Sequence, residues 1–130
     1  MKHIAIVENH LYSKAYARGK KYIARNVVVY VLKDLRSEKL KKENPMKEYV
    51  NRIGLTVTKK IGGAVIRNRI KRILREGLRQ AENELNLKKG YLIVLVARAC
   101  AIDAKADNIK KDLVRAFISL DMISEDEKNS

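Results

Sequence analysis

Apolar residues recur with two different periods along the chain, and each period predicts a different kind of element. Residues 8–18 place apolar and aromatic side chains, Tyr12 and Tyr16 among them, at i, i+1, i+4 and i+5. That spacing puts these side chains on one side of a helix. Asn9 is a candidate N-cap for the helix, and Gly19 is a candidate stop. The pattern therefore predicts a short helix over this segment.

Three segments have the composition or the period of β-strands. Residues 27–32 and 91–97 are runs of β-branched, aliphatic and aromatic side chains, which predict strands buried on both faces. Residues 52–58 alternate strictly, so one face of that strand should be apolar and the other polar and open. The apolar positions are Ile53, Leu55 and Val57, and the opposite positions are Gly54, Thr56 and Thr58.

Two longer segments have the period of amphipathic helices. A glycine pair at residues 62–63 breaks the preceding strand, and a helix is predicted over residues 64–87, ended by the Lys-Lys-Gly run at residues 88–90. Residues 104–120 predict a second amphipathic helix, with Ile109, Leu113, Ala116, Phe117 and Leu120 on one face. The order helix, strand, strand, helix, strand, helix predicts an α+β fold. It is a two-layer α/β sandwich in which helices pack on a small central sheet.

The rest of the chain gives the domain organisation. Residues 34–51 are charged and contain the only proline, Pro45, so they predict a long charged connection. Residues 124–130 are a polar tail that we expect to be disordered. No composition shift divides the remainder, so residues 1–123 are expected to form a single domain, which the charge pattern below marks as RNA-binding.

The net charge of the chain limits the classes of partner that it can bind. The chain holds 29 Lys and Arg against 15 Asp and Glu, a formal net charge of +14, and such a field attracts polyanions, nucleic acid first. A membrane partner is disfavoured because the apolar runs are far shorter than the roughly 20 residues of a spanning helix. With no signal peptide, we expect a cytoplasmic protein. Cys100 is the only cysteine and is expected to be a small core residue; we expect no metal site in the protein.

Half of the net charge lies in residues 59–79, which hold eight cations and one acid. On a helix, Ile66, Ile70, Ile73, Leu74, Gly77, Leu78 and Ala81 gather on one side, and Asn68, Arg72, Arg75 and Arg79 gather opposite, flanked by Arg67, Arg69 and Lys71. A merely solvated face normally mixes charge signs. Arginine suits bidentate phosphate contacts, and an asparagine amide can bond a base edge or a 2′-OH. The glycine pair is either a simple turn or a source of open amides for a phosphate.

A family resemblance rests on this same segment. From Lys60 to Glu76 the pattern is K-x-G-x-A-V-x-R-N-R-I-K-R-x-x-R-E, which resembles the signature of the bacterial ribonuclease P protein component. The resemblance extends to Tyr12, Tyr16 and Gly19, which look like the aromatic pair and glycine of the family's first helix. It also extends to the strand at residues 53–60 that leads into the signature.

The resemblance implies a fold and a division of labour. The fold would be like that of ribosomal protein S5 domain 2, with a left-handed βαβ crossover, an exception to the right-handed rule. The partners would be precursor tRNA and a catalytic ribonuclease P RNA. That RNA would use Mg²⁺ to remove the 5′ leader of the precursor. The protein itself would hold no catalytic residue and would bind neither DNA nor a membrane. Contacts to the RNA subunit would come from Lys60, Arg67, Asn68, Arg69, Lys71, Arg72 and Arg75. The leader would lie against Tyr12, Tyr16, Tyr30, Thr56 and Thr58.

Other functions fit the residues less well. An independent protein nuclease is a poor candidate, because no carboxylates cluster at metal-binding spacing. A DNA-binding helix is disfavoured by the lack of a preceding helix-turn and of a dimer seam. A ribosomal-type or RNA-chaperone protein without catalytic assembly stays as the alternative. The spacing of the tyrosines at positions 12 and 16 would by itself favour packing in the core. Together with the signature, it favours stacking of the two rings on bases.

Overall fold

The computed structural model describes residues 3–35 and 51–124. The described residues form a five-stranded sheet in the order β1-β4-β5-β3-β2. The strands are β1 (His3–Ala5), β2 (Lys20–Ile23), β3 (Val27–Lys33), β4 (Asn51–Thr56) and β5 (Tyr91–Ala97). The helices are α1 (Asn9–Arg18), α3 (Ala64–Glu84) and α4 (Ala106–Ser119), with a short 3-10 helix, η1 (Ala99–Asp103).

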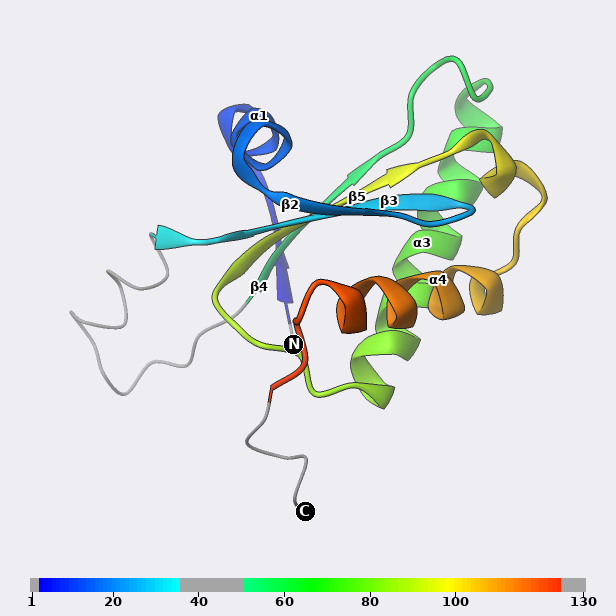
Figure 1. Cartoon of the computed structure of the whole chain (residues 1–130). Helices are drawn as coiled ribbons and strands as arrows, with labels where there is room; N and C mark the ends of the chain where they lie inside the picture. Colours follow the sequence, from blue (N-terminus) through cyan, green and yellow to red (C-terminus); the bar gives the residue numbers. More distant parts are fainter. Residues whose placement is uncertain (1–2, 36–50, 125–130) are drawn as a thin grey trace.

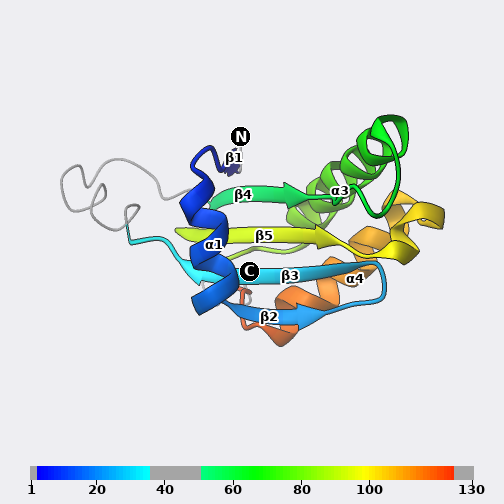
Figure 2. The ribbon, with the colours of Figure 1, turned by 90° about the horizontal axis from the view of Figure 1, so that it is seen from above.

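The helices cover the two faces of the sheet unequally. Helix α1 lies alone on one face, and α3 and α4 lie side by side on the other (Figure 1). Strand β4 pairs with β5 in parallel, so α3 is a crossover connection between neighbouring strands. Viewed from the α1 side with both strands pointing up and α3 behind the sheet, β5 lies to the right of β4, which makes the crossover left-handed (Figure 2).

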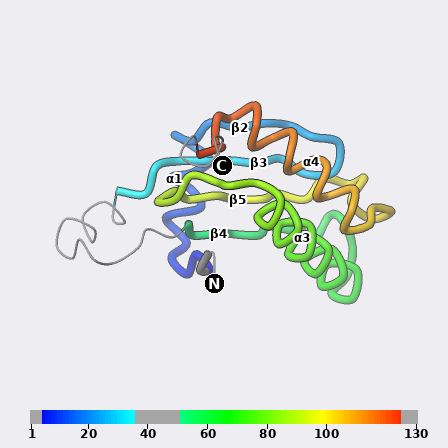
Figure 3. The backbone as a smooth tube through the Cα atoms, turned by 90° about the horizontal axis from the view of Figure 1, so that it is seen from below, coloured from blue at the N-terminus to red at the C-terminus, as the bar shows by residue number. Residues whose placement is uncertain are grey.

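The main core lies between the sheet and the α3–α4 pair. The inward side chains of β3 and β5 are buried there against the apolar stripes of both helices. Figure 3 shows α3 and α4 lying over the sheet on this side. The two helices approach closely at Gly77, where an added Cβ would lie 2.6 Å from Ile109 Cγ2. The largest fully buried side chains of this core are Phe117, Ile70, Leu74, Leu78, Ile93, Leu95, Ile109, Leu113 and Met122. This layer holds the α3 stripe on the sheet and turns its opposite side to solvent.

The predicted fold class is confirmed, and each predicted helix and strand is present. The first helix begins at Asn9, so its cap is Glu8 and not the expected asparagine. Helix α3 ends at Glu84 rather than at residue 87, because Leu85 is extended and Leu87 pairs with Ile123. In a longer helix, the backbone N–H and C=O groups around Leu87 would instead form hydrogen bonds within the helix.

Two strands were missed, and three smaller expectations were wrong. Strand β1 is only three residues long, and β2 is an edge strand whose mostly exposed residues show no apolar alternation. Strand β3 is buried on one face and half-buried on the other, because α1 covers only part of that face. The Gly54 side of β4 is not open, since the Tyr12 ring lies on it. Cys100 is exposed in η1, not a core residue. Most of the charged connection and of the polar tail falls outside the described residues.

Candidate nucleic-acid interface

Three predicted leader residues meet on the face of the sheet that α1 occupies. The Tyr16 hydroxyl, on α1, is 2.9 Å from Thr56 Oγ1, at the end of β4. The Tyr16 ring meets the ring of Tyr30, on β3, edge to face, with centroids 5.0 Å apart and planes at 69°. Tyr16 is 40% exposed, so this contact does not bury it. We call Tyr12, Tyr16, Tyr30 and Thr56 the aromatic face.

Tyr12 is a half-buried member of the aromatic face. Its ring lies on Gly54, where an added Cβ would be 2.5 Å from Tyr12 Cε1 and 2.8 Å from the hydroxyl oxygen. Burial raises the pKa of Tyr12, the nearby Tyr16 adds to the rise, and a hydrogen bond with the Leu55 backbone opposes it. Tyr12 therefore stays a neutral phenol, and only a glycine at position 54 leaves room for it. From its place on the polar side of the strand alone, this role of Gly54 could not be predicted.

Beyond α1, the sheet stays accessible. The helix crosses one end of the strands and leaves their other ends uncovered on that face (Figure 2). Val28 and Val96 are half-buried there, and Ile23 on the edge strand is 57% exposed. Thr58 is exposed just after β4, two residues beyond Thr56. Among the described residues, this face presents rings, methyl groups and hydroxyls, with Lys21 beside Tyr30.

A buried ion network, not anticipated from the sequence, anchors the start of α1. Arg52 on β4 donates to both oxygens of Asp34 at 2.6 and 2.8 Å and to Glu8 Oε2 at 3.4 Å. Arg52 and Asp34 are 8% and 4% exposed. Hydrogen bonding to Asp34 raises the pKa of Arg52 further, so the cation persists at any working pH. Because Glu8 is the N-cap of α1, the network ties that helix to β4 and to the residue that follows β3.

The second surface is the outer side of α3. Asn68, Arg72 and Arg75 are exposed on it, as predicted from the helical spacing, and Lys60 is exposed in the loop before it. Arg67 and Lys71 are half-buried along its flank. We call Lys60, Asn68, Arg72 and Arg75, with the flanking Arg67 and Lys71, the basic face. Since α3 lies under the sheet and α1 above it, the basic face and the aromatic face are on opposite sides of the sheet (Figure 1).

Two arginines of α3 are engaged within the protein. Arg69 donates to the carbonyl oxygens of Ile102 and Ala104 at 2.8 and 3.1 Å, so it holds η1 and the start of α4 against α3. Arg79 pairs with Glu76, and this pair lowers the pKa of Glu76 to about 2. The predicted RNA contact of Arg69 stays a prediction, and its observed bonds add a structural role.

The N-terminal end of α3 offers further donors. Gly63 is the N-cap, within the described chain no side chain caps this helix, and an added Cβ at Gly63 would meet nothing within 4 Å. The first-turn amides are thus open to solvent or to an anion. Nearby, Arg67 Nε is buried without a hydrogen-bond partner among the described residues. An unsatisfied buried donor of this kind costs about 1–3 kcal/mol, which a phosphate or base acceptor could offset.

The part of the chain that the structure describes contains no group of three or more His, Cys, Asp or Glu side chains placed to hold a metal. Over the same residues, no helix is long and apolar enough to cross a membrane. The two surfaces offer hydrogen bonding, stacking and positive charge.

Sequence comparison decides the family. The family model described as Ribonuclease P matches residues 1–121. The chain belongs to the ribonuclease P protein family. A ribonuclease P protein component of Clostridium acetobutylicum is 33% identical over 99% of this chain and 98% of its own length. One of Clostridium botulinum is 37% identical over 92% of this chain and 93% of its own length. Membership in this family makes the chain a ribonuclease P subunit that takes part in tRNA processing.

Solved structures of the family share the fold. The ribonuclease P protein of Staphylococcus aureus superposes with a TM-score of 0.72 at 25% identity, covering 95% of this chain and 100% of its own. That of Thermotoga maritima gives a TM-score of 0.60 at 23% identity, covering 80% of this chain and 86% of its own, which supports the fold alone. The recognition made from the signature segment is thus confirmed, and the individual site residues remain predictions.

Proposed function

We propose that the chain binds the catalytic RNA of ribonuclease P through its basic face and the 5′ leader of precursor tRNA through its aromatic face. The observation that carries this proposal is the separation of the two surfaces by the sheet, one strongly cationic and the other dominated by tyrosine rings. A single-surface RNA-binding protein would not need both. The assembly would work in the cytoplasm, where it would remove the leader and leave the mature 5′ end of the tRNA.

The aromatic face suits a single strand of variable sequence. Tyrosine rings stack on any base, for about 1–3 kcal/mol per base. Tyr16 presents a partly exposed ring whose hydroxyl is positioned by Thr56 and which meets the Tyr30 ring edge to face. Fixed rings lose little entropy when a base stacks on them. The leader would continue over the half-buried valines of the sheet toward Thr58.

The basic face suits a folded RNA. Three exposed side chains, Asn68, Arg72 and Arg75, project from successive turns of one helix, so they can contact phosphates and a base edge along a groove or a strand junction. The open amides at Gly63 and the buried Nε of Arg67 extend this surface to the start of α3. Each phosphate contact releases counterions, so affinity for the RNA subunit should fall steeply as salt rises.

Hydrolysis would belong to the RNA subunit. That RNA would use Mg²⁺ for the cleavage, and we assign no protein ligand to it. The role of this chain would be to raise the affinity for the substrate and to orient the leader. Such a contribution appears mainly when magnesium is scarce, because protein cations then replace part of the charge screening.

Reconstitution tests the proposal. The full chain is mixed with the catalytic RNA and a precursor tRNA at low magnesium, and release of the 5′ leader is followed over time. We expect cleavage to rise above that of the RNA alone. If the protein binds the RNA but cleavage does not rise, the alternative of an RNA-chaperone protein without catalytic assembly takes its place.

A further inference from the structure

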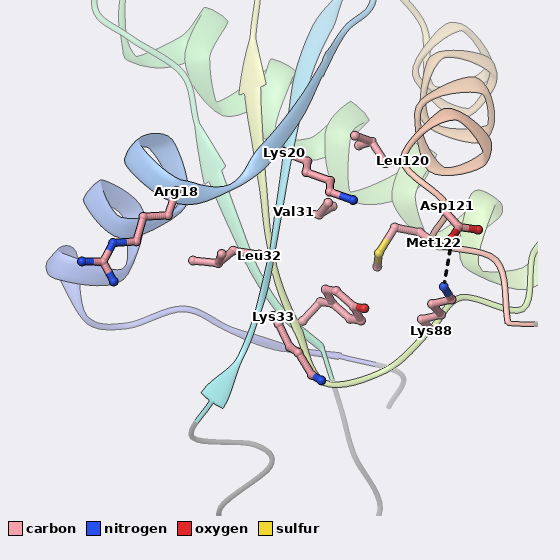
Figure 4. A pocket seen from close by; sticks show the side chains of 10 residues that line it. Arg18, Lys20, Val31, Leu32, Lys33, Lys88, Leu120, Asp121 and Met122 are labelled. Atoms are coloured by element: carbon pink, nitrogen blue, oxygen red, sulfur yellow. Dashed lines mark hydrogen bonds and ion pairs between the residues drawn. The ribbon is translucent and has the colours of Figure 1, made fainter.

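One recess outside the aromatic and basic faces lies beyond the end of α4, and its lining is shown in Figure 4. Arg18 and Leu32 point away from the other side chains that are drawn. The ammonium group of Lys33 also points away from those of Lys20 and Lys88. Because these side chains diverge, the recess is not a single binding site.

Another recess lies where the turn between β2 and β3 meets η1 and the start of α4. These segments lie together at one end of the sheet (Figure 2). The recess is a cavity of about 420 Å³. Ligand pockets begin at about 300 Å³, so there is room for one small molecule. We call this cavity the turn cavity, lined by Arg25, Asn26, Cys100, Asp103, Ala104 and Asn108.

Hydrogen bonds hold the β2–β3 turn in place beside the turn cavity. The Asn26 N–H donates to Asp112 Oδ2, on α4, at 2.9 Å. The Asn26 carbonyl oxygen accepts from the Arg98 N–H at 2.9 Å, and Arg98 Nη1 donates to Ala24 O at 2.7 Å. The turn is therefore fixed against α4 and against the residue that follows β5 before any ligand arrives.

The side-chain amide of Asn26 has no partner within the described part of the chain. Asn26 is only 6% exposed and both of its backbone polar groups are bonded, but its side chain forms no hydrogen bond with a described residue. Buried amides are normally hydrogen-bonded. The amide borders the turn cavity, so a molecule seated there can satisfy its donors and its acceptor.

Two opposite charges lie on the rim of the turn cavity. Arg25 comes from the β2–β3 turn and Asp103 from η1, and both are exposed. Neither forms an ion pair or a hydrogen bond with another described residue. A guanidinium binds a carboxylate, and a carboxylate binds an ammonium group. The head group of an α-amino acid carries both of these charges, so this lining suits a zwitterion better than a polyanion.

The rim of the turn cavity also carries a thiol. Cys100 lies in η1 and is exposed, and it is the only cysteine of the chain, so no internal disulfide competes for it. A thiolate attacks the sulfur of a disulfide and forms a mixed disulfide with one half of it. A small amino-acid disulfide thus meets a nucleophile and a complementary set of polar groups in one cavity.

We propose that Cys100 forms a reversible mixed disulfide with a low-molecular-weight amino-acid disulfide of the cystine type, whose zwitterionic head group sits in the turn cavity. Cys100 loses its thiol proton to water, and its thiolate attacks one sulfur of cystine. A new S–S bond forms to the retained half, the S–S bond of cystine breaks, and the other half leaves as a cysteine thiolate that takes up a proton. Cys100 is oxidised and the departing half is reduced.

The reaction needs neither the RNA subunit nor the leader, so its failure would leave the proposed function untouched. The test measures the rate at which cystine and the uncharged bis(2-hydroxyethyl) disulfide modify the full chain, followed by intact-mass spectrometry. The reference is a chain with Cys100→Ser and Ser119→Cys, which carries one exposed thiol at the end of α4, outside the turn cavity. We expect the ratio of the cystine rate to the uncharged-disulfide rate to be about tenfold higher for the native chain.

Variants of the cavity rim identify the groups that act. Arg25→Gln and Asp103→Asn each should lower that rate ratio several-fold, and both residues are exposed, so the fold should survive. Asn26→Ala should lower it as well. Arg115→Gln removes an exposed charge of α4 outside the cavity and should leave the ratio unchanged. The proposal is overturned if the native chain and the reference chain give equal ratios, since Cys100 would then react only as any exposed thiol does. It is also overturned if Arg25→Gln and Asp103→Asn both react like the native chain.

Discussion

Gly54→Ala tests how the aromatic face is built. The new methyl group would lie 2.5, 2.7 and 2.8 Å from Tyr12 Cε1, Cζ and the hydroxyl oxygen, closer than carbon atoms pack. The ring cannot simply swing away, because it packs on the cluster of Leu11, Ala15 and Val94 and its hydroxyl bonds with the Leu55 backbone. Overpacking of this kind costs about 1–3 kcal/mol. The gain from replacing a strand glycine offsets about 0.5–1 kcal/mol of that.

The expected result is a loss of about 1–2 kcal/mol in the free energy of unfolding. The affinity that the leader adds to precursor tRNA binding should fall about tenfold, roughly the contribution of one stacked base. Urea unfolding measures the first, and the ratio of holoenzyme affinities for precursor and mature tRNA measures the second. The affinity for the RNA subunit should not change, since α3 lies on the other face.

A double-mutant cycle decides whether the Tyr12 ring is the cause. In a Tyr12→Ala background the overlap is gone, so Gly54→Ala should cost nothing or stabilise slightly. Gly63→Ala is the control for steric overlap, because an added Cβ there meets nothing within 4 Å and its only expected cost is the loss of a glycine N-cap. Additive costs at positions 12 and 54 would refute the packing argument.

Three further predictions concern stability. Gly77→Ala should destabilise the fold by about 1–3 kcal/mol in urea unfolding despite alanine's better helix propensity, because its methyl group would lie 2.6 Å from Ile109 Cγ2; a stabilised variant would contradict the tight α3–α4 contact. Arg52→Met should cost about 3–5 kcal/mol by leaving Asp34 buried without its cation, and native-like stability would mean that the network matters little. The pKa of Glu76 is about 2 in the folded protein against 4.5 ordinarily. The stability that charged Glu76 contributes is therefore present above pH 4.5 and lost as the pH falls toward 2. Glu76→Gln should flatten the dependence of the free energy of unfolding on pH in that window. If the native chain and the variant showed parallel pH dependences, the pairing would be contradicted.

The strands and helices with strong periods could be predicted from the sequence. Strands β3 and β5 are β-branched runs, and the α3 stripe repeats with the helical period, so burial alone specifies them. Strand β2 could not be predicted in this way. Its Lys-Lys-Tyr-Ile segment lies at a sheet edge and forms because the hairpin brings it to β3, a tertiary effect that leaves no apolar alternation.

In the candidate site, too, residues that share one helix could be predicted from the sequence, whereas contacts between distant segments could not. Helical spacing places Asn68, Arg72 and Arg75 together, because they share one element. The meeting of Tyr16 with Thr56 joins residues 40 positions apart, and only the resemblance suggested it. The engagement of Arg69 with η1 carbonyls could not be foreseen, since a sequence does not show which cations find partners inside the fold.

The central claim is that the sheet separates an RNA-subunit surface from a leader surface. Its most direct test compares Arg72→Ala with Tyr16→Ala in two binding measurements, affinity for the catalytic RNA and the affinity ratio of precursor to mature tRNA. Arg115→Ala on α4, exposed and outside the signature, is the charge control, and Tyr16→Phe keeps the ring. We predict that Arg72→Ala weakens only the first quantity and Tyr16→Ala only the second. Loss of the same quantity in both variants would contradict the account.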